Sequence, residues 1–162
     1  MDFTNRKTTR KSAIKTFFAS AAAFFAGAVG IAGATDKKDR SIKHVADESN
    51  KGKSDVPLFS GSVTHNGLVY IAGKGYHQEG DIKKHTEEVL NSLERELEKA
   101  GTSMDNVLKV NVYLADLNDY DDMNSVYRGR FGDNPPVRTT VATYGGVPGK
   151  SLVEIDCIAA AG

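Results

Sequence analysis

The sequence predicts an α+β domain in which a mixed β-sheet is covered on one face by two helices. Residues 58–72 and 139–159 have the β-branched or alternating pattern of hairpins, and residues 108–114 alternate like a single strand. Apolar residues recur at three- and four-residue steps in 81–100 and 119–131, which is typical of helices. The order hairpin, helix, strand, helix, hairpin suits one sheet whose second face is free to pack against partners.

Residues 1–34 are predicted to be an export signal. Their basic residues are Arg6, Lys7, Arg10, Lys11 and Lys15, which against Asp2 alone give a net charge of +4. An apolar run over 17–34 follows and ends in the small residues 32–34, a typical cleavage site. The segment 10–15 resembles a twin-arginine signal with lysine in the second basic place. An uncleaved membrane helix is the alternative, since the run is near the lower limit of about 18 residues for spanning.

Residues 35–54 mix charges of both signs and are predicted to be a linker that leads into a domain over 55–162. After residue 34 the chain has 16 basic and 20 acidic residues, a net charge of −4. This net negative charge, with no cluster of basic residues, argues against nucleic acid as a partner. The single cysteine, Cys157, excludes an internal disulfide and is expected to be buried in a strand.

The first hairpin has the clearest local signal. Residues 58–64 alternate, 65–67 (His-Asn-Gly) supply a tight turn, and 68–72 return as an apolar strand. The following Gly73-Lys74-Gly75 lacks the spacing of a phosphate-binding loop.

The two helices are each predicted to bury one stripe of side chains. The first stripe comprises Ile82, Thr86, Val89, Leu93, Leu97 and Ala100, and the second comprises Tyr120, Met123, Tyr127 and Phe131. Gly101 and Gly132 are expected to end the helices, and Asn118 to cap the second. The strand between them should place Leu108, Val110, Val112 and Leu114 on one face. His77 and His85 lack a third ligand at a metal spacing, so no metal site is predicted.

The second hairpin holds the candidate site. Pro135 and Pro136 give the chain a stiff, extended approach, so Arg138 is presented at the start of a strand. The return strand carries Glu154 among apolar residues, where an unpaired charge would be costly to bury. Antiparallel pairing of these two strands would bring Arg138 to the far end of the second one.

The run Pro-Val-Arg-Thr-Thr-Val at 136–141, followed by Leu-Val-Glu-Ile-Asp-Cys-Ile-Ala at 152–159, resembles the C-terminal signature of the reactive intermediate deaminase family, the Rid or YjgF-type proteins. The segments 111–117 and 123–127 stand in the matching order upstream. The resemblance extends from about residue 41 and implies a first strand within 41–47. It also implies a chorismate-mutase-like two-layer subunit, a homotrimer with pockets between neighbours, and no cofactor.

The resemblance implies hydrolysis of 2-imino or enamine acids to 2-oxo acids and ammonia, as by a 2-iminobutanoate/2-iminopropanoate deaminase. Arg138 would clamp the substrate carboxylate, and Glu154 with a backbone carbonyl would orient the attacking water. Asn124 corresponds to the family's helix asparagine, and Thr140 is expected to line the pocket. The alternatives are a structural ion pair of Arg138 with Glu154, an exposed carboxylate at Glu154, and an amide at Asn124 that fixes a loop.

Two positions depart from the family pattern. The pocket tyrosine of the family falls on Leu58, and the serine of its Ser-Gly-Gln falls on Ala72, so the segment here is Ala72-Gly73-Lys74. Each lost hydroxyl can cost about 1 to 3 kcal/mol where its partner is left buried and unpaired. The pocket, with Gly73 in its lining, is therefore expected either to prefer bulkier, more apolar imino acids or to bind without turnover.

Two functions from different classes follow. The first is the imine deaminase; the second is a non-catalytic protein that binds a small carboxylate in the same pocket. The expected partners are a small imino or oxo acid and further copies of the chain, with a membrane contact only through an uncleaved signal. A periplasmic location is expected from residues 1–34, and a cytoplasmic one from most of the family.

Overall fold

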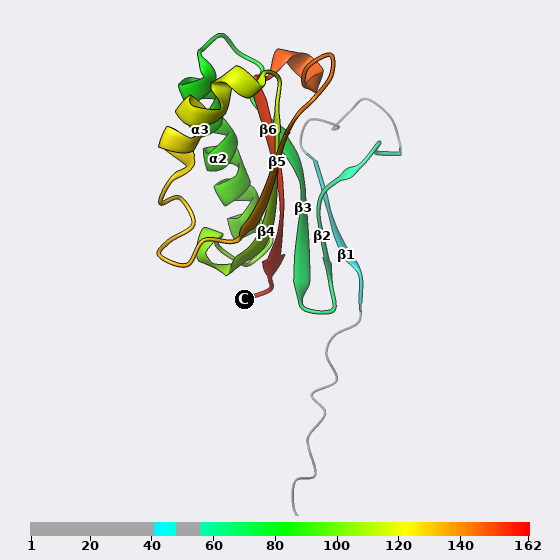
Figure 1. The fold of residues 1–162 in the computed structure, drawn as a ribbon. Coiled ribbons are helices and arrows are strands. Elements are labelled where there is room, and N and C mark those ends of the chain that lie inside the picture. Colours follow the sequence, from blue (N-terminus) through cyan, green and yellow to red (C-terminus); the bar gives the residue numbers. More distant parts are fainter. Residues whose placement is uncertain (1–40, 48–55) are drawn as a thin grey trace, which may run out of the picture. The chain divides into compact units, whose positions relative to one another are not determined.

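The computed structural model describes residues 41–47 and 56–162, which form the domain of Figure 1. The predicted export signal at 1–34 lies outside these ranges, as does most of the predicted linker. Within them, no helix has the length and apolar character needed to cross a membrane.

Six strands form one mixed sheet in the order β1-β2-β3-β6-β4-β5. The strands are β1 (Lys43–Ala46), β2 (Ser60–His65), β3 (Leu68–Gly75), β4 (Val107–Leu114), β5 (Val137–Ala142) and β6 (Val153–Ala160). Neighbours are antiparallel except β4 and β5, which are parallel. The helices α2 (Ile82–Lys99) and α3 (Tyr120–Tyr127) both cover the same face (Figure 1). The predicted fold class, a mixed sheet with two helices on one face, is confirmed.

The C-terminal hairpin prediction is wrong. β5 pairs with β4 in parallel, while β6 is inserted between β3 and β4 and touches β5 nowhere in the register. In that central position β6 has hydrogen-bonded neighbours on both sides, β3 and β4, whereas the edge position of β5 offers only one. The inward residues of β6 accordingly are all buried: Val153, Ile155, Cys157 and Ala159. Strand β5 is left at the edge of the sheet.

The first hairpin forms as predicted, with shifted strand limits. Asn66 and Gly67 have φ values of 54° and 76°, the left-handed conformations that a two-residue hairpin turn of this kind requires. Strand β2 begins two residues later than predicted, so Leu58 lies outside it and is 86% exposed. Strand β3 runs on to Gly75, past the predicted end at 72.

Helix α2 matches the predicted segment closely. The Asp81 carboxylate caps it by accepting a hydrogen bond from the Lys84 backbone N–H at 2.8 Å. Gly101 follows its last turn with φ of 82°. Five of the six predicted stripe residues are buried, and Ala100 packs against the core from a partly buried position.

The second helix is shorter than predicted. Asn118 does not cap it but lies in a 3₁₀ turn, Leu117–Asp119, where its N–H donates to the Asp116 carboxylate. The helix ends at Tyr127 because Arg128 takes an extended conformation and Gly129 follows with φ of 79°. Gly132 therefore comes after the end and does not cause it.

Two side chains that were predicted to be buried are exposed. Tyr120 is 38% exposed, although Met123, Tyr127 and Phe131 of the same stripe are buried. Leu108 is 49% exposed because the pairing of β4 with β6 shifts register between Val107 and Lys109. The bulge removes Leu108 from the alternation, and Val107 takes the place in the core.

The core lies between the helices and the sheet, and Cys157 is part of it. Its thiol is free and only 2% of the residue is exposed. Burial raises the pKa of the Cys157 thiol from 9.0 to about 12, and the neighbouring Asp156 carboxylate acts in the same direction.

We predict that this thiol makes the domain lose stability in alkali. Between pH 9 and about 12 the unfolded chain releases the Cys157 proton while the folded chain keeps it, so the free energy of unfolding falls as pH rises. The variant Cys157→Ala is less stable at pH 7 because a buried sulfur is lost, but the difference from the native chain narrows above pH 9. Urea denaturation at pH 7, 9 and 10.5 measures the free energy of unfolding of both chains. A difference between them that stays constant over this pH range contradicts the prediction.

Candidate functional site

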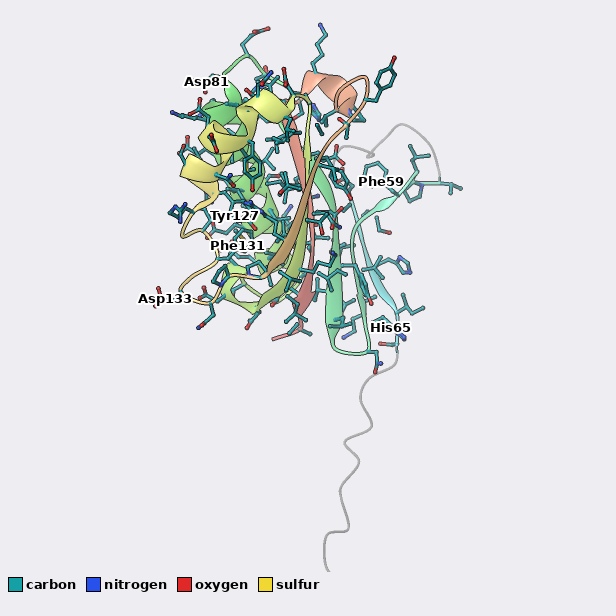
Figure 2. All side chains as sticks on the ribbon, in the orientation of Figure 1. Phe59, His65, Asp81, Tyr127, Phe131 and Asp133 are labelled. Atoms are coloured by element: carbon teal, nitrogen blue, oxygen red, sulfur yellow. The ribbon has the colours of Figure 1, made fainter. Side chains whose placement is uncertain are left out.

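Arg138 points toward the helices from the edge strand. In the parallel pairing of β5 with β4 it lies beside Val110, which is fully buried under the helices. Neighbours in register share a face of the sheet, so the guanidinium is directed at α3. Figure 2 shows Tyr127 and Phe131 on this same side of the sheet.

Three side chains of α3 hold the guanidinium. Arg138 Nη1 donates to Asn124 Oδ1 at 2.8 Å, and Nη2 donates to the Tyr120 hydroxyl at 3.2 Å. The guanidinium carbon also lies 4.7 Å from the centre of the Tyr127 ring, a cation–π distance. The spacing 120, 124 and 127 places all three on one face of the helix. Asn124 therefore fixes the arginine and does not merely order a loop.

This arginine has no carboxylate partner in the described ranges, since none lies within 4 Å of it. Its charge is balanced only by neutral acceptors and aromatic faces. Two of its five N–H donors are used, and the remaining ones can serve a ligand. The cavity beside it, here called the arginine pocket, has a volume of about 590 Å³. Its lining includes Tyr120, Asn124, Tyr127, Phe131, Asp133 and Arg138. The arrangement suits a small anion.

The buried hydroxyls of Tyr127 on α3 and Thr140 on β5 have no hydrogen-bond partner among the described residues. Burial raises the pKa of Tyr127 to about 12, although the charge of Arg138 acts in the opposite direction. A phenol is neutral at physiological pH even at its ordinary pKa of 10, so Tyr127 adds no negative charge next to the guanidinium. Thr140 follows Arg138 by two residues, and so shares its face of β5.

Glu154 lies in a second cavity, here called the glutamate hollow, with a volume of about 670 Å³. In register it is flanked by Gly75 of β3 and Tyr113 of β4. Its carboxylate lies over Gly73, where an added Cβ would overlap it. A side chain at 73 would therefore displace the Glu154 carboxylate from this position. The lining of the hollow includes Phe59, Ala72, Gly73, Lys74, Glu96 and Glu154.

Hydrogen bonds of residues 151–153 hold the start of β6, the strand that carries Glu154. The Ser151 hydroxyl accepts from the Tyr76 N–H at 2.9 Å and donates to the Val153 carbonyl at 2.6 Å. The Leu152 N–H donates to Nδ1 of the buried His85 at 3.1 Å. These contacts use His85 for structure, and no group of three metal-ligating side chains is found in 41–47 or 56–162.

Arg138 and Glu154 lie on opposite faces of the sheet within one protomer. Arg138 shares the helix face with Val110, whereas Glu154 stands between the buried Val153 and Ile155 and so points to the other face. The interpretation of Arg138 as an ion-pair partner of Glu154 is therefore wrong.

The predicted site residues thus fall into two groups. Asn124 and Thr140 lie on the side of Arg138, and Ala72 and Gly73 lie in the hollow with Glu154. Leu58 is exposed and lines neither cavity.

The sequence analysis missed three residues that the geometry brings into these cavities. Tyr120 and Tyr127 were assigned only to a buried stripe, although their spacing from Asn124 already places all three on one helix face. Lys74 was considered only as part of a glycine-rich segment. No local pattern predicts its burial, because its partners come from β1 and α2, far along the chain.

Fold and pocket together define an α+β protein in which Arg138 faces a cavity beside α3. A family model described as Endoribonuclease L-PSP matches residues 53–161. A RutC family protein of Pyrococcus horikoshii is 37% identical over 125 residues, 73% of this chain and 98% of that relative. A RutC family protein of Pyrococcus abyssi is 34% identical over 118 residues, 68% of this chain and 92% of that relative.

Solved structures agree with these relatives. A member of the YjgF protein family from Neisseria meningitidis superposes with a TM-score of 0.66 at 26% identity, covering 76% of this chain and 97% of that one. A Yersinia pestis protein of the conserved Rid family, described as of unknown function, gives a TM-score of 0.63 at 27% identity, covering 74% and 99%. The chain belongs to the Endoribonuclease L-PSP family, that of the Rid and YjgF-type proteins.

We predict that Thr140→Val raises the free energy of unfolding by about 1 kcal/mol, because it removes a buried hydroxyl that has no partner among the described residues while keeping the volume. Thr102→Val is the matched control, since the Thr102 hydroxyl donates to the Ala160 carbonyl at 2.7 Å and its loss should lower the free energy of unfolding by about 1 kcal/mol. Urea denaturation measures both variants. A loss of stability in Thr140→Val would mean that the hydroxyl is paired in the native protein.

Proposed function

We propose that this protein hydrolyses 2-imino and enamine acids to 2-oxo acids and ammonia. Membership of the family supports a Rid-type activity in general. The observation that carries the more specific proposal is Arg138, which is fixed by Asn124 and Tyr120, faces a cavity of about 590 Å³ and has no carboxylate partner in 41–47 or 56–162. Such a guanidinium is prepared to hold the carboxylate that every substrate of this class carries.

The reaction makes modest demands on the site. Water adds to the C=N carbon, the nitrogen takes up protons, and the C–N bond breaks to leave a carbonyl and ammonia. The imine carbon is already electrophilic, so a fixed substrate carboxylate and an oriented water account for most of the task. In the proposal Arg138 fixes the substrate carboxylate, and Glu154 with a backbone carbonyl orients the water. Glu154 takes a proton from this water and returns it to the leaving nitrogen.

We propose that the site is built from two copies of the chain in a homotrimer. Arg138 and Glu154 lie on opposite faces of one sheet, so one copy does not bring them to the same substrate. The face away from the helices also carries exposed apolar side chains, which a neighbouring copy would cover. These are Tyr70 of β3 and Val137 and Val141 of β5.

The departures at Leu58 and Ala72 bear on the substrate. Ala72 lines the glutamate hollow without a hydroxyl, and Leu58 is exposed and apolar. We therefore propose imino acids with bulkier, more apolar side chains as the preferred class. RNA cleavage, which the description of the family model names, is not favoured, because the chain after residue 34 has 16 basic against 20 acidic residues.

Export by the segment 1–34 remains part of the proposal. It places the reaction in the periplasm and requires a source of imino acids there.

We predict that Arg138→Ala lowers kcat/KM for imine hydrolysis on the order of 100-fold, because the substrate carboxylate loses its fixed partner. An L-amino-acid oxidase generates imino acids in situ, semicarbazide traps them, and the loss of trapped product reports hydrolysis by residues 35–162. Small and aromatic side chains are compared. Arg95→Ala, an exposed arginine on α2, is the matched control and should hydrolyse at the native rate.

Absence of suppression by the native chain with every side chain contradicts the enzyme proposal. A rise in melting temperature with 2-oxo acids in that case would identify a small-carboxylate-binding protein.

We also predict that two inactive variants complement each other. If each site takes Arg138 from one copy and Glu154 from its neighbour, an equal mixture of Arg138→Ala and Glu154→Gln chains, co-refolded, recovers about a quarter of native activity, since each intact site needs one copy of each kind. The assay is the same trapping reaction, with each variant refolded alone as control. Recovery no greater than the mean of the separate variants contradicts a site shared between copies.

A further inference from the structure

A buried lysine stands where the sheet opens beside Glu154. The pairing of β2 with β3 ends at Ser62 and Ile71, so the last part of β3 has no β2 residue beside it in the register. Lys74 lies in this part and is only 7% exposed. A lysine buried to this extent needs compensating charge, because removing an ammonium from water is costly.

Two carboxylates from distant parts of the chain supply that charge. Lys74 Nζ lies 3.3 Å from Asp47 Oδ2, just beyond β1, and 3.4 Å from Glu96 Oε2 on α2. The side chains of Asp47 and Glu96 are themselves 15% and 10% exposed. The lysine therefore links β3, the end of β1 and α2 across the glutamate hollow, whose lining includes all three residues.

The backbone around Lys74 is also the surface against which Glu154 rests. The register of β3 against β6 shifts between Ile71 and Lys74, so Ala72 and Gly73 form an irregularity in the strand. Gly73 lies directly under the Glu154 carboxylate, and Gly75 stands opposite Glu154 in register. Lys74 lies between these glycines, and its side chain points to the helix side with its register partner Ile155.

We propose that Lys74 is a positioning residue for Glu154. Its contacts with Asp47 and Glu96 hold the Ala72–Gly73 irregularity in place, and this fixes the floor on which the Glu154 carboxylate lies. The catalytic consequence rests on the proposed function, whereas the coupling of Lys74 to the Glu154 side chain does not.

The kinetic expectation separates positioning from substrate binding. Because the carboxylate clamp is Arg138, on the other face of the sheet, Lys74→Met should lower kcat about tenfold and leave KM unchanged. Lys74→Arg keeps the charge and should recover much of the loss. Lys83→Met is the matched control, since Lys83 on α2 is 52% exposed, pairs with Asp122 at 3.1 Å and lies outside the glutamate hollow. It should behave as the native chain.

A second measurement does not depend on activity. In protein labelled with ¹³C at the glutamate side-chain carboxyl, the Glu154 resonance is assigned by its loss in Glu154→Gln. We expect this resonance to move in Lys74→Met and to stay in place in Lys83→Met, below the melting temperature of each variant. If Lys74→Met does not fold, Glu96→Gln is measured in its place. This variant keeps Lys74 beside Asp47, so we expect the Glu154 resonance to move in it by a smaller amount.

The two measurements separate the possible failures. A native chain without imine hydrolysis overturns the proposed function, and the Glu154 resonance then still decides whether Lys74 positions the glutamate. A folded variant with an unmoved resonance, or with unchanged kcat in an active protein, overturns the inference and leaves Lys74 as a stabilising ion pair only.

Discussion

The placement of β6 between β3 and β4 is the constraint on which the rest of the site depends. It brings Glu154 beside the glycines of β3 and leaves β5 at the sheet edge, where Arg138 meets α3. The alternation of side chains along a strand then puts the two charged groups on opposite faces. A single topological choice thus divides the candidate site into an arginine half and a glutamate half, and makes a second copy of the chain the natural way to join them.

The arginine half shows how a partly buried cation is kept without an acid beside it. A carboxylate partner would neutralise the guanidinium and compete with any anionic ligand, whereas the Asn124 amide, the Tyr120 hydroxyl and the Tyr127 ring orient it and leave its charge in place. The Tyr127 phenol, whose pKa burial raises to about 12, adds no negative charge at physiological pH. The lining of the pocket holds the charges of Arg128, Arg138 and Asp133.

Local physics made much of this structure predictable. The period of α2 and the Asn66-Gly67 turn follow from nearby residues, and both appear where they are predicted. The pairing of β5 could not be predicted in this way, because no short pattern distinguishes a parallel neighbour 28 residues upstream from a hairpin partner. The site residues were named from a motif, but their division between two faces depends on that pairing. Leu108 shows the same limit, since a bulge in β4 is set by its partner β6.

The two halves of the site solve opposite electrostatic problems. A clamp for a carboxylate needs a positive charge that is held but not neutralised, and neutral hydrogen bonds from α3 provide it. A water-orienting carboxylate needs a fixed position more than a particular field, so the hollow around Glu154 can use full charges at Lys74, Asp47 and Glu96 to hold the backbone. A buried ion pair adds little stability in comparison with apolar packing. Its place beside a glycine that must stay free of a side chain is better explained by the precision it gives to one carboxylate.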